Sequence, residues 1–107
     1  MTTTGIDYKT DTTTTTKLMP HYNVIVYNDD EHSFPFVVEI FNKVLRYDID
    51  KCTRLAWDVH RNGRSIVWTG TLEVAELKKE QLANCGKDPY GDLKIDAPLV
   101  VTIEISV

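Results

Sequence analysis

The sequence predicts an α+β domain in which a small sheet of about three strands has one face covered by three helices. Two observations carry this prediction. Short β-branched and aromatic runs occur three times after residue 20, and apolar residues at helical spacing fill the intervals between them. The resulting order is β-α-α-β-α-β, and strands separated by helices pack as a layer of helices on a sheet.

Length and charge narrow the class of protein. The chain has 107 residues and a mass of 12.2 kDa, which suits one domain. With a formal charge of -4, the protein lacks the positive electrostatic field that nucleic-acid binding needs. No apolar run approaches the roughly 20 residues that cross a bilayer, so we expect a soluble, cytoplasmic protein without a membrane partner. Cys52 and Cys85 predict neither a disulfide framework nor a zinc site, as expected in a reducing compartment.

The N-terminal residues differ in composition from the rest of the chain. Nine of the first sixteen residues are threonine, and few are large and apolar. Such a segment buries too little surface to offset the entropy lost on ordering. Residues 1–19 therefore predict a flexible Thr-rich extension, and residues 20–107 predict the folded domain.

The first half of the domain predicts a strand and two helices. The strand spans Tyr22–Tyr27 and ends at a turn of Asn and Asp residues. Ser33 caps a helix that runs to Leu45, with apolar residues one, three and four positions apart. Asp50 caps the second helix, which repeats apolar residues at i, i+3, i+4 and i+7 and stops near Gly63.

The second half predicts a strand, a helix and a closing strand. Ser65–Trp68 is the strand, Thr71 caps a helix through about Asn84, and Leu99–Ile105 alternates apolar and polar residues. Residues 85–97 carry Gly, Pro and Asp without a clear period. They predict a long surface loop whose role stays open.

Common enzyme signatures are missing from the sequence. Cys52 and His60 lie eight residues apart on one predicted helix, about 12 Å at 1.5 Å per residue, too far for a nucleophile and its base. The sequence has no G-x-S-x-G, P-loop or H-E-x-x-H motif. The residues that could gather around a metal match no known ligand spacing; they are His21, His32, His60, Asp29 and Asp30. Acyl transfer, nucleotide hydrolysis and zincin chemistry therefore have no local signature in the sequence, and we expect no cofactor.

The segment 28–33 (NDDEHS) is more informative, because it joins a strand end to a helix start and carries three acidic groups. Two interpretations stay open. One is an acidic turn followed by a helix cap. The other is a polar rim that attracts a cation: if His60 approaches this rim, Asn28, Asp29 and His60 can accept hydrogen bonds from an ammonium group.

Five motifs in order along the chain resemble the ClpS adaptor family. They are N-D-D at 28–30, F-V-V at 36–38, V-H-x-x-G at 59–63, T-x-E-V-A-E-x-K at 71–78 and P-L before the final strand. The resemblance covers about residues 20–105. It implies an adaptor without catalytic activity. ClpS proteins bind N-degrons, which are substrates with a bulky hydrophobic N-terminal residue, and deliver them to a Clp AAA+ unfoldase and its ClpP peptidase.

The resemblance also implies roles for individual residues. Asn28, Asp29 and His60 match the residues that receive the substrate's α-amino group, and Asp30 and His32 belong to the same rim. The side-chain pocket is matched by Val37, Ala56, Val59 and Leu99, with Phe34 at its mouth in place of the usual methionine. Glu73 and Lys78 match positions that contact the N-terminal domain of a ClpA- or ClpC-type unfoldase, and the Thr-rich extension matches the segment that engages it during delivery. Such an adaptor is expected to be a monomer.

Two departures from the family pattern lead to hypotheses. Ala56 stands where many members carry methionine, which predicts a roomier pocket that admits Ile or Val or binds Trp more tightly, unless Trp57 fills the space. His32 replaces a small hydroxyl residue and predicts binding that weakens below about pH 6.5, where a histidine ring becomes positively charged. The alternative is that His32 is a solvent-exposed loop residue.

Two other functions stay open at this point. One is a docking domain that modulates a Clp unfoldase without recognising N-termini. The other is a small metal-dependent hydrolase that uses His32, His60 and Asp29. Peptide binding separates the adaptor from the docking domain, and elemental analysis tests the hydrolase.

Overall fold

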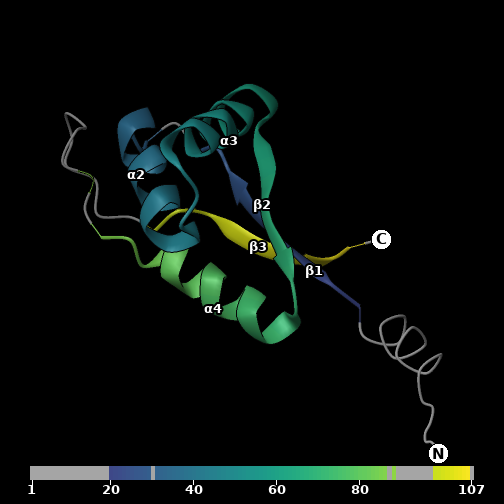
Figure 1. Ribbon diagram of the computed structural model, residues 1–107. Helices are drawn as coiled ribbons and strands as arrows, with labels where there is room; N and C mark the ends of the chain where they lie inside the picture. The colour runs from purple at the N-terminus through teal and green to yellow at the C-terminus, as the bar shows by residue number, and fades with distance from the viewer. Residues whose placement is uncertain (1–19, 30, 87, 89–97, 107) are drawn as a thin grey trace, which may run out of the picture.

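The computed structural model describes residues 20–29, 31–86, 88 and 98–106. The order of its elements is β1 (Tyr22–Tyr27), α2 (Phe34–Leu45), α3 (Ile49–Asn62), β2 (Arg64–Gly70), α4 (Leu72–Ala83) and β3 (Val101–Ile105) (Figure 1). This α+β order is the one that the sequence predicts. The proposed extension, residues 1–19, and most of the 85–97 loop lie outside the described residues.

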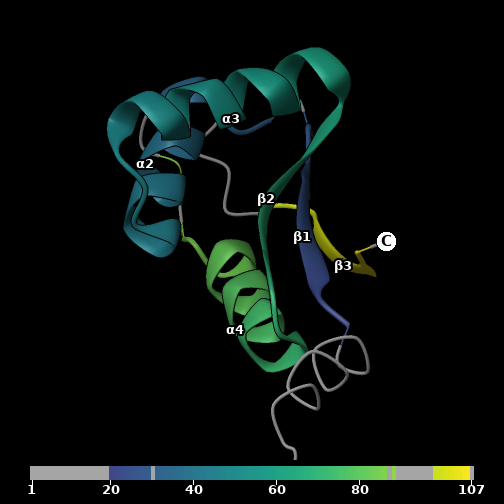
Figure 2. The same cartoon turned by 45° about the vertical axis from the view of Figure 1, so that its right-hand side comes forward.

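Within the described residues the strands form one antiparallel sheet in the order β2-β1-β3. Figure 2 shows α2, α3 and α4 on the same side of this sheet, as predicted. The helices α2 and α3 lie near the end of the sheet where β1 finishes, and α4 lies near its other end. The end of β1 therefore meets the helical layer directly.

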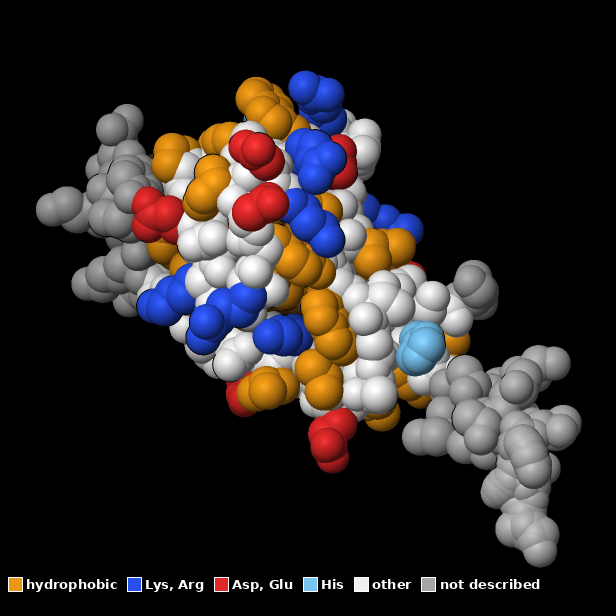
Figure 3. Space-filling model, in the orientation of Figure 1, with side chains coloured by type: hydrophobic (Ala, Val, Ile, Leu, Met, Phe, Trp, Pro, Cys, Tyr) orange, Lys and Arg blue, Asp and Glu red, His pale blue; other side chains and the backbone are white. Residues whose placement is uncertain are grey.

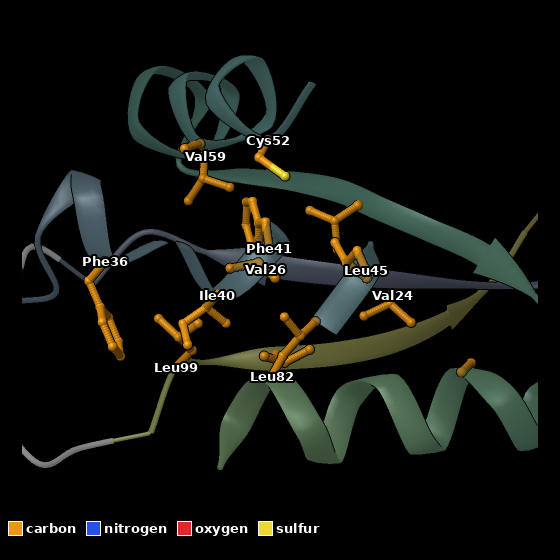
Figure 4. Packing of buried hydrophobic residues seen from close by; sticks show 14 residues of the cluster. Val24, Val26, Phe36, Ile40, Phe41, Leu45, Cys52, Val59, Leu82 and Leu99 are labelled. Atoms are coloured by element: carbon orange, nitrogen blue, oxygen red, sulfur yellow. The ribbon is translucent and has the colours of Figure 1, made fainter. Parts of the chain in front are cut away.

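The core lies between the sheet and the helices. Val26 of β1 lies beside Phe41 of α2, and Val24 lies further along the strand near Leu45 (Figure 4). Val59 of α3 and Leu82 of α4 belong to the same cluster. All are buried. Alternate residues of β1 thus supply the apolar face that the helices cover, which fixes the register of the central strand.

The helix starts agree with the sequence except at α3. Ser33 caps α2 and Thr71 caps α4, as predicted. The cap of α3 is Asp48, whose carboxylate accepts the Lys51 N–H at 2.8 Å, and the prediction of Asp50 was wrong. Both aspartates can cap, but Asp50 lies inside the first turn, where its charge interacts favourably with the helix dipole.

Two strand boundaries also differ from the prediction. The middle strand is longer than Ser65–Trp68, since it pairs with β1 from Arg64 to Gly70 through a bulge opposite Val24 and Ile25. The last strand starts at Val101 instead of Leu99. The Val100 carbonyl still accepts the Tyr27 N–H at 3.0 Å, so the chain runs beside β1 before the regular ladder begins.

Candidate functional site

A cavity of about 420 Å³ opens where the end of β1, the start of α2 and the last turns of α3 meet. It is lined by Asn28, His32, Phe34, Val37, Ala56, Trp57, Val59 and His60. Its volume is in the range of small-ligand pockets. Polar groups and apolar side chains therefore face one space of the size of a small ligand.

Asn28 and His60 meet because α3 ends beside the last residue of β1. Gly63 adopts a left-handed conformation (φ 84°) that terminates α3 and turns the chain into β2. Its carbonyl accepts the Asn28 N–H at 2.9 Å. This bond fixes Asn28 next to the last turn of α3, which carries His60. His60 therefore lines the same cavity as Asn28 and His32 of the 28–33 segment.

Asp29 and His32 form a pair behind this rim. The Asp29 Oδ1 atom accepts the N–H groups of Glu31 at 2.9 Å and His32 at 3.0 Å, and its Oδ2 atom pairs with the His32 Nδ1 atom. Burial raises the pKa of the Asp29 carboxyl, but these donors outweigh burial and hold that pKa below its ordinary value. The carboxylate is therefore ionised at neutral pH and can only accept hydrogen bonds, so the His32 Nδ1 atom carries the hydrogen.

His32 is not a solvent-exposed loop residue. Its side chain is 1% exposed, and the Asp29 side chain is 15% exposed. The imidazole stacks on Phe36, with ring centroids 5.6 Å apart and planes 13° from parallel. His32 lines the cavity, whereas Asp29 lies behind it and is not part of the lining.

Aromatic side chains form one wall of the cavity. Phe34 and Trp57 lie with ring centroids 4.7 Å apart, and the edge of Trp57 meets His60 at 5.8 Å. The Arg61 guanidinium stacks over Trp57 at 5.1 Å. Trp57 is 42% exposed and was expected only as a competitor for the space left by Ala56. Its helical position three residues before His60 was the signal that it could reach the cavity.

Small aliphatic side chains form the apolar wall. Val37 of α2 and Ala56 and Val59 of α3 line the cavity, and the last two are buried and belong to the core. Because a methyl group at position 56 extends only slightly from α3, the cavity keeps space beside it.

Two other predicted site residues have different outcomes. Leu99 is not part of the lining; it is 3% exposed in the core, near Ile40 and Leu82 (Figure 4). Its position just before β3 points it under α2 instead of toward α3. Asp30 lies outside the described residues.

The predicted unfoldase contacts, Glu73 and Lys78, lie on α4, away from the cavity. Glu73 is exposed in the first turn of α4. The Lys78 ammonium donates to the Val44 carbonyl at 3.0 Å and so satisfies a carbonyl at the end of α2. This contact between elements 34 residues apart had no local signal in the sequence.

Lys78 also borders a second hollow, which we call the α2–α4 groove. It has a volume of about 560 Å³ and is lined by Ile40, Lys43, Val44, Arg46, Lys78, Glu80, Gln81, Asn84 and Cys85. In Figure 3, Lys and Arg side chains gather where α2 ends beside α4. The groove shares no lining residue with the cavity.

Asp88 binds the start of α2 beside the cavity, a contact that the sequence analysis missed. Its carboxylate accepts the Ser33 N–H and, at 3.0 Å, the Ser33 hydroxyl, and the residue is only 1% exposed. Ser33 in turn caps α2 immediately before Phe34. Nothing local marks Asp88 among the acidic loop residues, because its partner lies 55 residues away.

The described residues give no support to the metal-dependent hydrolase. Among them, no three His, Cys, Asp or Glu side chains are grouped so that they could hold a metal ion. No helix in this part of the chain is long and apolar enough to cross a membrane.

Comparison with known proteins decides the family. Residues 17–101 match the family model described as ATP-dependent Clp protease adaptor protein ClpS. The chain belongs to the ClpS family. It is 35% identical over 91 residues to the ClpS adapter protein of Vibrio atlanticus (strain LGP32), covering 83% of this chain and 80% of that protein. It is 34% identical over 83 residues to the ClpS of Escherichia fergusonii, covering 78% and 73%.

A solved structure is similar as well. Agrobacterium tumefaciens ClpS2 bound to L-phenylalaninamide matches with a TM-score of 0.70 and 26% identity, over 81% of this chain and 98% of that one. Together these matches confirm the predicted function, an adaptor that recognises N-degrons for a Clp protease. They do not favour a docking domain that ignores N-termini.

Proposed function

We propose that the cavity binds the N-terminal residue of an N-degron substrate. Asn28 and His60 accept hydrogen bonds from the α-amino group, with the Asp29 carboxylate supplying negative charge behind them. The apolar side chain enters between Val37, Ala56 and Val59, and Phe34 and Trp57 form its aromatic wall. The observation that carries this proposal is that polar acceptors and apolar walls line the same cavity.

A free N-terminus matches this combination. It is the place in a chain where a backbone cation sits beside a side chain, so both features of the cavity are used at once. Acetylation removes the charge and leaves acceptors without partners, which costs about 1 to 3 kcal/mol for each buried group. Burying a Leu or Phe side chain contributes roughly 1.5 to 3 kcal/mol. Together these effects favour free, bulky N-termini over internal residues.

The ligand of the similar structure supports this assignment. L-phenylalaninamide has a free α-amino group, an amidated carboxyl group and a phenyl side chain, so it has the chemistry of an N-terminal phenylalanine in a peptide. ClpS2 of Agrobacterium tumefaciens binds that compound. An aromatic N-terminal residue also suits the wall formed by Phe34 and Trp57, whose rings lie 4.7 Å apart.

We further propose that α4 contacts the N-terminal domain of a ClpA- or ClpC-type unfoldase. Glu73 is exposed there, and Leu72 and Leu77 expose 42% and 51% of their surface beside it. Lys78 contributes from the same helix. In this proposal the protein works as a cytoplasmic monomer without catalytic activity or cofactor, and residues 1–19 engage the unfoldase during delivery.

The test is fluorescence anisotropy with labelled peptides that begin with Leu, Phe, Tyr, Trp, Ile or Val. Each peptide has an N-acetylated control, and circular dichroism shows that the protein is folded. We expect micromolar or tighter binding of free bulky N-termini and at least tenfold weaker binding after acetylation. Equal binding of free and acetylated peptides, or no binding by the folded protein, would overturn the proposal.

A further inference from the structure

His32 lines the cavity and also contacts a charged group of the rim. It packs on Phe36, its side chain is almost fully buried, and its Nδ1 atom pairs with the Asp29 carboxylate. The His32 backbone N–H binds the other oxygen of the same carboxylate at 3.0 Å. One residue therefore holds both oxygens of Asp29.

We propose that His32 is a positioning residue for amine recognition, which holds the Asp29 carboxylate and sets its effective charge toward the substrate. This inference rests on the proposed function of the cavity. The neutral ring orients the carboxylate and leaves its full negative charge to attract an ammonium group. The His32 backbone N–H and the Nδ1 hydrogen together hold the two carboxylate oxygens in one orientation.

Burial makes this coupling strong. Because the His32 side chain is 1% exposed, solvent screens the His32–Asp29 pair less than it screens a surface pair. Packing on Phe36 also fixes the ring, so the Nδ1 hydrogen stays directed at Asp29. The orientation of Asp29 is important because its carboxylate and the other acceptors of the rim must all face the same ammonium group of the substrate.

Other charged groups near His32 must be kept constant in a test. Asp29 and Glu31 belong to the same segment, and His60 of α3 lines the same cavity. The Asp88 carboxylate binds Ser33, the next residue, and Cys85 interacts with both Asp29 and Asp88. The substitutions therefore change His32 alone and leave these groups in place.

Three substitutions separate positioning from packing. In His32→Asn the amide nitrogen lies where Nδ1 lies, two bonds beyond Cβ, so it can donate to Asp29 but cannot titrate. In His32→Gln the amide is one carbon further away and cannot place a donor at that position. In His32→Ala the donor is removed.

The measurement is the affinity for a Phe-initiated peptide at pH 7.5, with its N-acetylated form as control. We expect His32→Asn to bind within about threefold of the unsubstituted protein, and His32→Gln and His32→Ala to bind at least tenfold more weakly. Rescue by Asn but not by Gln would show that a donor at the Nδ1 position, and not packing alone, supports binding.

Two outcomes would overturn the proposal. One is that His32→Asn binds as weakly as a folded His32→Ala variant. The other is that His32→Gln or a folded His32→Ala variant binds as tightly as the unsubstituted protein. If the unsubstituted protein itself does not distinguish free from acetylated peptides, the proposed function of the cavity fails instead.

Discussion

The cavity and the α2–α4 groove are both hollows beside α2, but they differ in how their polar groups are arranged. In the cavity, Asn28 and His60 stand at the edge of an apolar space, and the charge of Asp29 is held behind them by backbone donors and His32. In the groove, charged residues line the space, and Lys78 is bound to the end of α2. The first arrangement suits one small group with a cation and an apolar part, and the second suits a broad polar surface.

The two hollows should therefore respond independently to substitution. They share no lining residue, and substitutions without shared partners usually have additive effects. A change in the cavity should alter peptide binding alone. A change on α4 should alter unfoldase binding alone.

The largest expected effect is the loss of peptide binding in His60→Ala. A charge-assisted hydrogen bond contributes about 1.5 to 3 kcal/mol, so we expect roughly 10- to 150-fold weaker binding of a free Phe-initiated peptide. His60 is exposed at the end of α3, and the fold should survive. Anisotropy measures the peptide affinity, and a pull-down with the N-terminal domain of the unfoldase should be unchanged.

His21→Ala is the matched control, because His21 is exposed and does not line the cavity. It should bind the peptide as tightly as the unsubstituted protein. If His60→Ala weakened both interactions equally, the separation between the cavity and α4 would be wrong.

A second effect concerns the size of the cavity. Ala56→Met adds a long side chain to the apolar wall, so we expect about tenfold weaker binding of peptides that begin with Trp, Ile or Val. Leu- and Phe-initiated peptides should change by less than threefold. Ala83→Met, on α4, is the control for the substitution itself. Unchanged ratios among the six peptides would show that Trp57, not Ala56, limits the cavity.

Most of the residues that line the cavity could be predicted from the sequence. They lie near the ends of helices and strands, and strong local signals mark those ends. Ser33 and Gly63 mark where α2 starts and α3 ends, and the strand signal places Asn28 just after β1. Once α3 is followed by a strand antiparallel to β1, Asn28 and His60 must lie close together. The proximity of Asn28 and His60 therefore follows from the local signals that end β1 and α3 and from the antiparallel pairing of the strands.

Contacts between distant segments could not be predicted in the same way. The bond from Lys78 to Val44 and the bonds from Ser33 to Asp88 depend on packing of residues 34 and 55 positions apart. Leu99 shows that the location of a buried residue also depends on contacts between distant segments. Its apolar character predicted burial correctly, but only the packing of α2 decides that it lies in the core and not in the cavity lining.

A third prediction tests the groove through Lys78→Met. The substitution keeps an aliphatic side chain but removes the ammonium that binds the Val44 carbonyl, so we expect a loss of about 1 kcal/mol in the free energy of unfolding. Urea denaturation measures it. Peptide affinity should stay within twofold while unfoldase binding weakens, and the exposed neighbour Lys79→Met should leave stability unchanged. Weaker peptide binding by Lys78→Met would contradict the independence of the two hollows.

The smallest expected effect is the pH dependence of stability contributed by Asp29. Since its pKa is lower in the folded protein than in the unfolded chain, its hydrogen bonds stabilise the fold fully above the unfolded value of about 3.9. This contribution is lost as the pH falls through the lower folded pKa. Asp29→Asn should be less stable by a constant amount, below about 1 kcal/mol, from pH 7 to 5, and the difference should shrink below pH 4.

Urea denaturation at pH 7, 5 and 3.5 measures this difference, with Asp58→Asn, an exposed aspartate of α3, as the control. A difference that persists unchanged at pH 3.5 would mean that Asp29 stabilises the loop through its shape and not through its charge. A difference that shrinks there, together with full peptide binding at pH 7, links the same ionised carboxylate to both folding and recognition.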